Sequence, residues 1–108
     1  MSAGPPIHVD AQLGGPVAAR SILASTFGLV ADLPPAVRSG CGREVPRAMT
    51  SVRPEAVTCP PCREFAAAAH ERLAEQVETL GAMPGSPFTP AQAQEAAAHH
   101  RAMARRFR

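Results

Sequence analysis

Three cysteines carry the chemistry that is easiest to recognise in this sequence. Cys59 and Cys62 form a Cys-Pro-Pro-Cys pair, and Cys41 lies upstream between two glycines. No other cysteine occurs in the 108 residues. Two thiols separated by two residues can fold around the same ion, and three sulfurs with one imidazole complete a tetrahedral zinc site. The spacing therefore predicts one structural zinc ion held by Cys41, Cys59, Cys62 and a fourth ligand.

The fourth ligand must come from a histidine or a carboxylate. His70 follows Cys62 on the same predicted helix, at a distance of about 12 Å along the axis, which one ion does not span easily. His99 and His100 lie on a basic helix and are expected at the surface. His8 lies in a short extended segment that can pair beside a hairpin. We therefore predict that His8 completes the site, with the other candidates left open.

Local backbone features also favour metal binding at the cysteines. A helix is expected to start at Pro60, and the partial positive charge of its N-terminus favours deprotonated sulfur. Gly42 follows Cys41 and allows the positive-φ turn in which backbone N–H groups can point at sulfur.

Three helices and one hairpin are predicted to position these ligands. The first helix opens at Gly14-Gly15-Pro16 and is stopped by Leu33-Pro34-Pro35. Residues 37–58 contain valines separated by prolines and are predicted to form a short, irregular β-hairpin. The second helix runs from Pro60 to Leu80 and the third from about 90 to 107 with Thr89 as its cap. The apolar stripe expected on the second helix is Phe65, Ala69, Leu73, Val77 and Leu80, and that on the third is Ala96, His100, Met103 and Phe107.

The fold class predicted is therefore mostly α with a small β-hairpin, in a zinc-stapled single domain. Its expected divisions are a disordered leader (1–6), a zinc-stabilised domain (7–80), a linker (81–89) and a basic C-terminal helix (90–108). The chain has no Trp, no Tyr and only four Phe. A core with so few large side chains needs additional stabilisation, which a bound metal ion can supply.

The N-terminal residues lack the basic start and apolar run of a secretory signal, and no stretch reaches the length of a membrane span. We expect a cytoplasmic protein with no membrane contact. In a reducing compartment a Cys-x-x-Cys pair is more often a metal or redox site than a disulfide.

His8, Cys41-Gly42-Arg43 and Val57-Thr58-Cys59-Pro60-Pro61-Cys62-Arg63 together resemble a group of small actinobacterial zinc-finger-like proteins. Their pattern is His, then Cys-Gly-Arg, then Val-Thr-Cys-Pro-x-Cys-Arg opening a helix. The group resembles treble-clef or zinc-knuckle modules, and most of its members have no assigned activity. The resemblance covers residue 8 and residues 41–63. It implies metal binding in a bacterial protein and leaves the biological role open.

Two chemical alternatives use the same cysteines. Cys59 and Cys62 at a helix N-terminus could act as a thiol-disulfide redox pair, but such proteins need a strand after the helix, and nothing after Leu80 reads as a strand. A nucleobase-deaminase site needs His-x-Glu, where this chain has Asp10, and it leaves Cys41 without a role. Inert or disulfide-bonded cysteines are the remaining interpretation.

Charge gives a third alternative. The formal net charge is +2, and the last ten residues carry Arg101, Arg105, Arg106 and Arg108 with no acid. These arginines could contact nucleic acid or another partner, although cations at a helix C-terminus also complement the helix dipole. The function predicted is a non-catalytic zinc-binding adaptor or regulatory module acting through a protein partner, with nucleic-acid binding as the alternative. The oligomeric state is left open.

Overall fold

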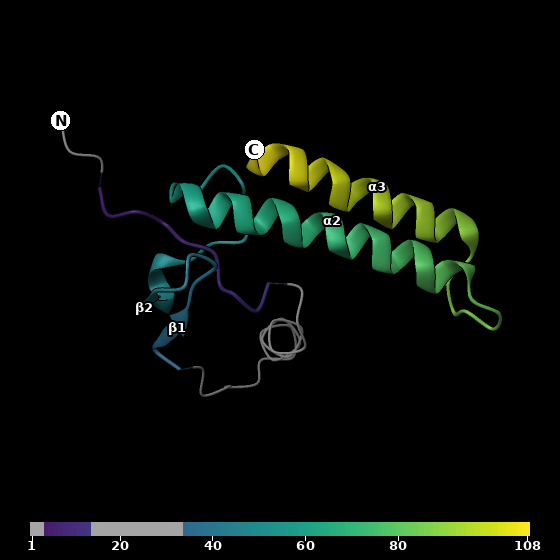
Figure 1. The fold of residues 1–108 in the computed structure, drawn as a ribbon, viewed down its shortest axis with the longest axis horizontal. Helices are drawn as coiled ribbons and strands as arrows, with labels where there is room; N and C mark the ends of the chain where they lie inside the picture. The colour runs from purple at the N-terminus through teal and green to yellow at the C-terminus, as the bar shows by residue number, and fades with distance from the viewer. Residues whose placement is uncertain (1–3, 14–33) are drawn as a thin grey trace.

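The computed structural model describes residues 4–13 and 34–108. Figure 1 shows two long helices lying side by side, with a small hairpin beside the first turns of one of them. The C-terminus returns to the end of the molecule that holds the hairpin. The elements are β1 (Ala36–Arg38), β2 (Glu44–Pro46), the 3-10 turn η1 (Arg47–Met49), α2 (Pro60–Ala82) and α3 (Pro90–Phe107).

The predicted fold class is wrong in its number of helices. Over the described residues the chain has two α-helices and a two-stranded antiparallel hairpin, rather than three helices. The helix expected to open at Pro16 lies within residues 14–33, outside the described part of the chain. Its prediction used apolar residues at uneven intervals, and the first of them, Leu13, ends a turn in which its N–H donates to the carbonyl of Asp10. The predicted combination of mostly α structure with a small hairpin agrees with the structure.

Helix α2 begins where the sequence indicates. Cys59 is its N-cap residue, and Pro60 and Pro61 occupy the first turn, where a missing N–H costs no hydrogen bond. The helix continues to Ala82, two residues beyond the predicted end at Leu80.

Helix α3 starts at Pro90 as predicted, and Thr89 is its cap. The N–H of Gln92 donates to Thr89 Oγ1 at 3.1 Å. In return, the N–H of Thr89 donates to Gln92 Oε1 at 2.9 Å. This reciprocal pair is a capping box, which satisfies two backbone donors at the helix start.

Alanines, not large apolar residues, form most of the contact between α2 and α3. The apolar stripe predicted on α2 is only partly correct, since Leu73 and Val77 are half-buried and Leu80 is 50% exposed. Small side chains let two helix axes approach closely, so the Ala-rich faces pack together and the larger residues are left at the margins. On α3 the predicted Phe107 is buried, whereas Ala96, His100 and Met103 are half-buried. The buried residues on the two helices are Cys62, Ala66, Ala67, Ala69, His70 and Ala74 on α2 and Ala93, Ala97, Ala104 and Phe107 on α3.

The hairpin is present but shorter than predicted. Strands β1 and β2 pair antiparallel, with Val37 opposite Val45. Val52 and Val57 lie outside the strands, and they differ in environment, since Val52 is 63% exposed and Val57 is buried. Pro46 ends β2 because proline has no N–H to continue the ladder. The strands therefore enclose Cys41 in their turn, and the loop after η1 carries the chain to Cys59.

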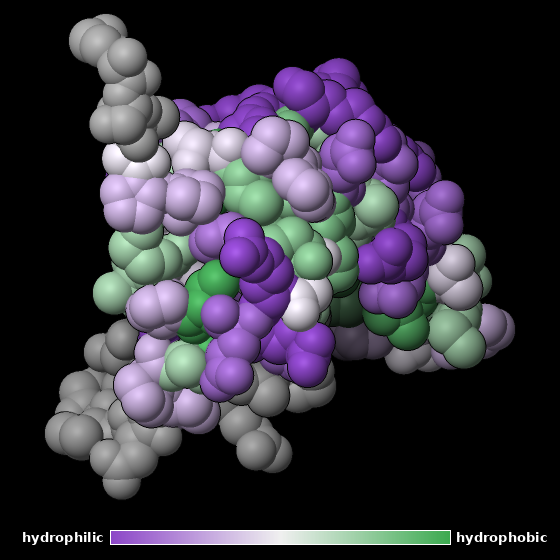
Figure 2. Space-filling view, turned by 60° about the vertical axis from the view of Figure 1, so that its left-hand side comes forward, coloured by the Kyte–Doolittle hydropathy of each residue, from purple (hydrophilic) through white to green (hydrophobic). Residues whose placement is uncertain are grey.

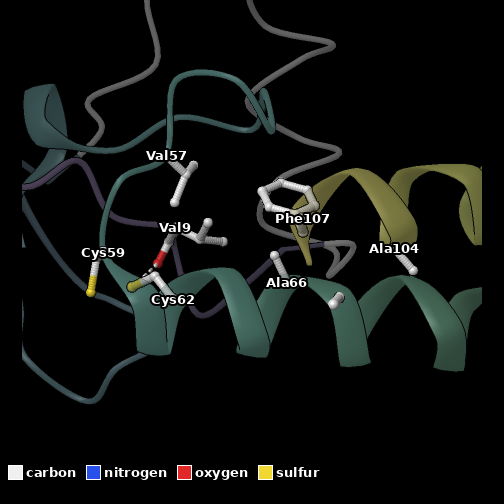
Figure 3. Close-up of a cluster of buried hydrophobic side chains, with 8 residues drawn as sticks. Val9, Val57, Cys59, Cys62, Ala66, Ala104 and Phe107 are labelled. Atoms are coloured by element: carbon white, nitrogen blue, oxygen red, sulfur yellow. Dashed lines mark hydrogen bonds between the residues drawn. The ribbon is translucent and has the colours of Figure 1, made fainter.

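One hydrophobic core connects the hairpin end of the molecule to both helices. Val9, Val57, Cys62, Ala66 and Phe107 belong to it, and Figure 3 shows Val9 lying between Val57 and the start of α2. In the described residues neither helix has the length and apolar character needed to cross a bilayer.

Candidate metal centre

The structure brings one histidine and all three cysteines together. The nearest ligand atoms of His8, Cys41, Cys59 and Cys62 lie within 4.8 Å of one another. His8 Nδ1 is 3.6 Å from Cys41 Sγ and 3.5 Å from Cys62 Sγ. His8, Cys59 and Cys62 are buried, and Cys41 is half-buried. These four residues are close enough to bind one metal ion.

His8 is held by backbone hydrogen bonds on both of its peptide groups. Its N–H donates to the carbonyl of Met49 at 2.8 Å, and its carbonyl accepts from the N–H of Ser51 at 2.9 Å. These bonds form an isolated parallel bridge to Thr50. The extended segment predicted around His8 therefore pairs with the chain just after η1. This pairing fixes the position of the imidazole relative to the sulfurs.

The residues on either side of His8 are tied to the cysteine segments. The carbonyl of Ile7 accepts from the N–H groups of Thr58 and Cys59, and the carbonyl of Val9 accepts from the N–H of Gly40 at 2.7 Å. The N-terminal segment thus joins the Cys41 turn to the start of α2. Backbone pairing, rather than the metal alone, aligns the two halves of the site.

Cys41 lies in the tight turn that joins β1 to β2. The N–H of Gly42 donates to the carbonyl of Ser39 at 2.9 Å, and Gly42 has φ 88°, a conformation that suits glycine. Gly40 faces α2 so closely that a Cβ there would lie 2.5 Å from Phe65 Cδ1. The absence of a side chain at Gly40 therefore lets the turn carrying Cys41 pack directly against Phe65.

The start of α2 presents the other two sulfurs. Figure 3 shows the Cys59 and Cys62 side chains at the first turn of the helix, with their sulfurs at the same end. The N–H of Arg63 donates to the carbonyl of Cys59 at 3.0 Å, which forms the first turn of the helix. Cysteine at the N-cap and at the third helical position places both sulfurs beside the positive end of the helix dipole.

The surroundings shift two of the thiols in opposite directions. A hydrogen bond with the Ser39 hydroxyl, whose Oγ lies 2.9 Å from Cys41 Sγ, is the main reason that the pKa of Cys41 falls to about 6. Burial raises the pKa of Cys59. Without a metal ion, a negative charge in this cluster therefore falls first on Cys41, because the same charge on Cys59 would be poorly solvated.

Ser39 and Phe65 are the residues of this site that sequence reasoning missed. Ser39 is 1% exposed, and its hydroxyl lies between Cys41 Sγ and the carbonyl of Arg43. Its place two residues before Cys41 in a Ser-Gly-Cys-Gly turn was the available signal, since serine commonly bonds to nearby groups in turns. Phe65 could be recognised as apolar but not as the partner of a glycine far away in sequence.

The remaining histidines lie elsewhere. His70 and His100 contact each other between α2 and α3, with His99 beside them. They are on the helical part of the molecule and do not belong to the cluster around His8.

Most of the basic C-terminal residues are engaged in ion pairs. Arg106 contacts Glu55 at 2.8 Å, Arg108 contacts Glu71 at 2.6 Å, and Arg101 contacts Glu78. Arg105 is exposed on the same helix. The tail is therefore a set of partly neutralised surface pairs that join α3 to α2 and to the loop before it.

Comparisons of this chain with protein-family models, curated proteins and solved structures gave no match. The resemblance to small actinobacterial zinc-finger-like proteins consequently stays a prediction.

Proposed function

We propose that this protein is a non-catalytic, zinc-stabilised binding module that acts through contact with another protein. The observation that carries the proposal is the convergence of His8, Cys41, Cys59 and Cys62 on one point. Three thiolates and one imidazole form a donor set typical of structural zinc. A cluster of thiolates also fits the reducing compartment, the cytoplasm, that the sequence favours.

Two interatomic distances are compatible with zinc. In a tetrahedral zinc site the Zn–N bond is about 2.0–2.1 Å and the Zn–S bond about 2.3 Å, which puts nitrogen and sulfur ligands about 3.5–3.6 Å apart. His8 Nδ1 lies 3.5 Å from Cys62 Sγ and 3.6 Å from Cys41 Sγ. The backbone pairing described above therefore holds His8 Nδ1 and these two sulfurs at separations that suit a zinc ion.

A structural role is favoured over catalysis by the number of ligands. Four protein ligands fill a tetrahedral zinc ion and leave no position for a water or substrate, whereas catalytic zinc keeps one position open. The redox alternative for Cys59 and Cys62 is not favoured either, because the chain after α2 continues into α3 rather than into a strand. The zinc ion would act by holding the Cys41 turn, the N-terminal segment and α2 together.

A protein partner is favoured over nucleic acid by the surface. Leu80, Met83 and Phe88, near the connection between α2 and α3, are 50%, 54% and 48% exposed. Large apolar side chains that are exposed on neighbouring segments suit contact with a protein surface better than contact with phosphates. On the face shown in Figure 2, by contrast, hydrophobic residues form small areas between hydrophilic ones. The ion pairs of Arg101, Arg106 and Arg108 reduce the charge available to phosphates.

Elemental analysis of the purified protein tests the zinc proposal. We expect about one zinc ion per chain and loss of helical circular dichroism on addition of a strong chelator, because the binding free energy of such a site is folding free energy. Cys41→Ser and His8→Ala should each lower the zinc content, whereas His99→Ala, which changes a surface histidine, should not. Metal-free protein with an unchanged spectrum would disprove the proposal.

The choice of partner class has its own test. Titration with double-stranded DNA over a salt series should show no steeply salt-dependent binding. A steep slope that disappears when residues 99–108 are deleted would favour the nucleic-acid alternative instead.

A further inference from the structure

A second histidine cluster lies at the contact between the two helices. His70 on α2 and His100 on α3 approach with their Nδ1 atoms 3.0 Å apart, and their ring centroids are 5.2 Å apart. His70 is 6% exposed, and His100 is half-buried. Two titratable side chains thus occupy a helix contact that is otherwise built mainly from alanine.

This geometry keeps its hydrogen bond only while at least one of the two imidazoles is neutral. A hydrogen bond between two Nδ1 atoms needs one of them protonated and the other with a free lone pair. When both imidazoles are protonated, two N–H donors face each other at a distance where neither can accept. Full protonation therefore replaces an attraction across the contact with a repulsion.

The other nitrogen of His70 increases the cost of protonation. His70 Nε2 is buried and has no hydrogen-bond partner in the described residues. A proton added there would be an unsatisfied buried donor carrying charge, which is among the more expensive groups to bury. Burial, followed by the charges of His100 and His99, lowers the pKa of His70. Burial and His99 lower the pKa of His100.

No nearby carboxylate compensates for this charge. Over the described residues neither imidazole lies within ion-pair distance of an acid, and the surrounding acids and bases of both helices are mostly engaged with one another. On α2, Glu71 pairs with Arg108 and Glu78 with Arg101. Glu75 and Arg105 line a surface recess together with Glu71 and Arg101. His99 is the remaining titratable neighbour.

The pair is connected to the core around the metal centre. The His70 ring stacks on Phe107, with ring centroids 5.7 Å apart. Phe107 is 1% exposed and belongs to the same core as Cys62 and Val9. A change in how α3 packs at His100 would therefore reach the residue that covers this core.

We propose that His70 and His100 form an acid-sensitive latch that holds α3 against α2 when both are neutral and weakens as the pH falls. The direction of this pH dependence follows from the difference in proton binding between the folded and the unfolded chain. Since a histidine with a lowered folded-state pKa binds fewer protons than in the unfolded chain, stability is complete above about pH 6.5 and decreases below it. At mildly acid pH, α3 should loosen from α2.

The latch is tested with the full-length, metal-loaded protein and three variants. His100→Gln removes the partner of His70, and His70→Phe keeps a planar ring on Phe107 without a titratable nitrogen. His99→Gln is an intermediate variant, because it removes a neighbouring charge and leaves the hydrogen bond between His70 and His100 in place. For each protein, the urea midpoint and the amide protection factors of α3 are measured from pH 7.5 to pH 5.5.

We expect the folding equilibrium constant of the wild type to fall about tenfold more over this range than that of His100→Gln or His70→Phe, with His99→Gln in between. As the pH is lowered, the amide protection factors of α3 should fall before those of α2. Acid release of the metal affects all four proteins alike and cancels in the comparison. Equal pH dependence in all four, or histidine NMR titrations that place His70 and His100 at or above pH 6.5, would overturn the proposal.

Discussion

Ser39 contributes to the metal centre without being a ligand. Its hydroxyl stabilises the Cys41 thiolate, and the pKa of Cys41 is about 6 instead of 9.0. Because the folded-state pKa is lowered, this ionisation stabilises the folded site above about pH 9 in full and is lost as the pH falls through about 6. At neutral pH a metal ion bound here would therefore compete little with a proton for the Cys41 sulfur.

Ser39→Ala should therefore weaken zinc binding in a pH-dependent way. If the pKa of Cys41 returns toward that of an ordinary thiol, proton competition lowers the affinity by about ten- to hundredfold at pH 7 and by only about twofold at pH 9. Competition with a chromophoric chelator at both pH values measures this. Ser86→Ala, in the loop before α3, is the control. A loss of equal size at pH 7 and pH 9 would mean that Ser39 acts only by holding the turn.

At the level of single elements, the turn between β1 and β2 depends on its contact with α2. Gly40 has no room for a side chain, because a Cβ would lie 2.5 Å from Phe65 Cδ1 and 2.9 Å from Phe65 Cβ. The second contact is close to the helix backbone, so a rotation of the phenyl ring cannot relieve it. A larger residue would push the turn, and Cys41 with it, away from the other ligands.

Gly40→Ala should destabilise the protein by about 1–3 kcal/mol, the usual cost of overpacking, and should lower the zinc affinity. Urea unfolding and chelator competition measure the two effects. Gly4→Ala is a matched control, since nothing lies within 4 Å of a Cβ at Gly4. Adding Phe65→Ala to the Gly40→Ala variant should recover part of the lost zinc affinity and stability. A double variant whose losses simply add would contradict the proposed contact.

The same elements show what the sequence could and could not predict. Helix starts at Pro60 and Pro90 were predictable because proline and the Thr89 cap are local signals. The sulfur pair of Cys59 and Cys62 was predictable for the same reason. The alanine-based contact between the helices could not be predicted, because the apolar face of a helix is recognised from large side chains such as Leu73 and Val77. The Gly40–Phe65 contact depends on tertiary packing and has no local signature.

At the level of the whole molecule, Arg63 joins segments that are distant in sequence. Its Nη1 donates to the carbonyls of Pro54 at 2.6 Å and Val57 at 2.7 Å, and its Nη2 donates to the carbonyl of Arg106 at 2.7 Å. Its guanidinium lies 5.8 Å from the centre of the Phe107 ring. One side chain next to the metal centre thus fixes both the loop before α2 and the end of α3.

Arg63→Met should destabilise the protein by about 2–4 kcal/mol, because three carbonyls lose a charged donor and two of them belong to the buried residues Pro54 and Val57. Arg63→Lys should recover little of this, since an ammonium group cannot reproduce the planar fork. Thermal unfolding and limited proteolysis near residue 107 measure the effect. Arg72→Met, an exposed arginine on the same helix, should change stability by no more than about 0.5 kcal/mol. Similar losses for both variants would contradict the role given to Arg63.

The position of His8 in the chain has a consequence for biosynthesis. His8 and Cys62 are separated by 54 residues, so at a translation rate of about 5–20 residues per second, roughly 3–10 s pass between their synthesis. During this interval the imidazole and the Cys41 thiol are already made, but the Cys59/Cys62 pair does not yet exist. Metal loading with the complete donor set must then follow the emergence of α2 from the ribosome. Zinc supply in the expressing cell at that moment, rather than in the purification buffer, should decide how much correctly assembled protein is obtained.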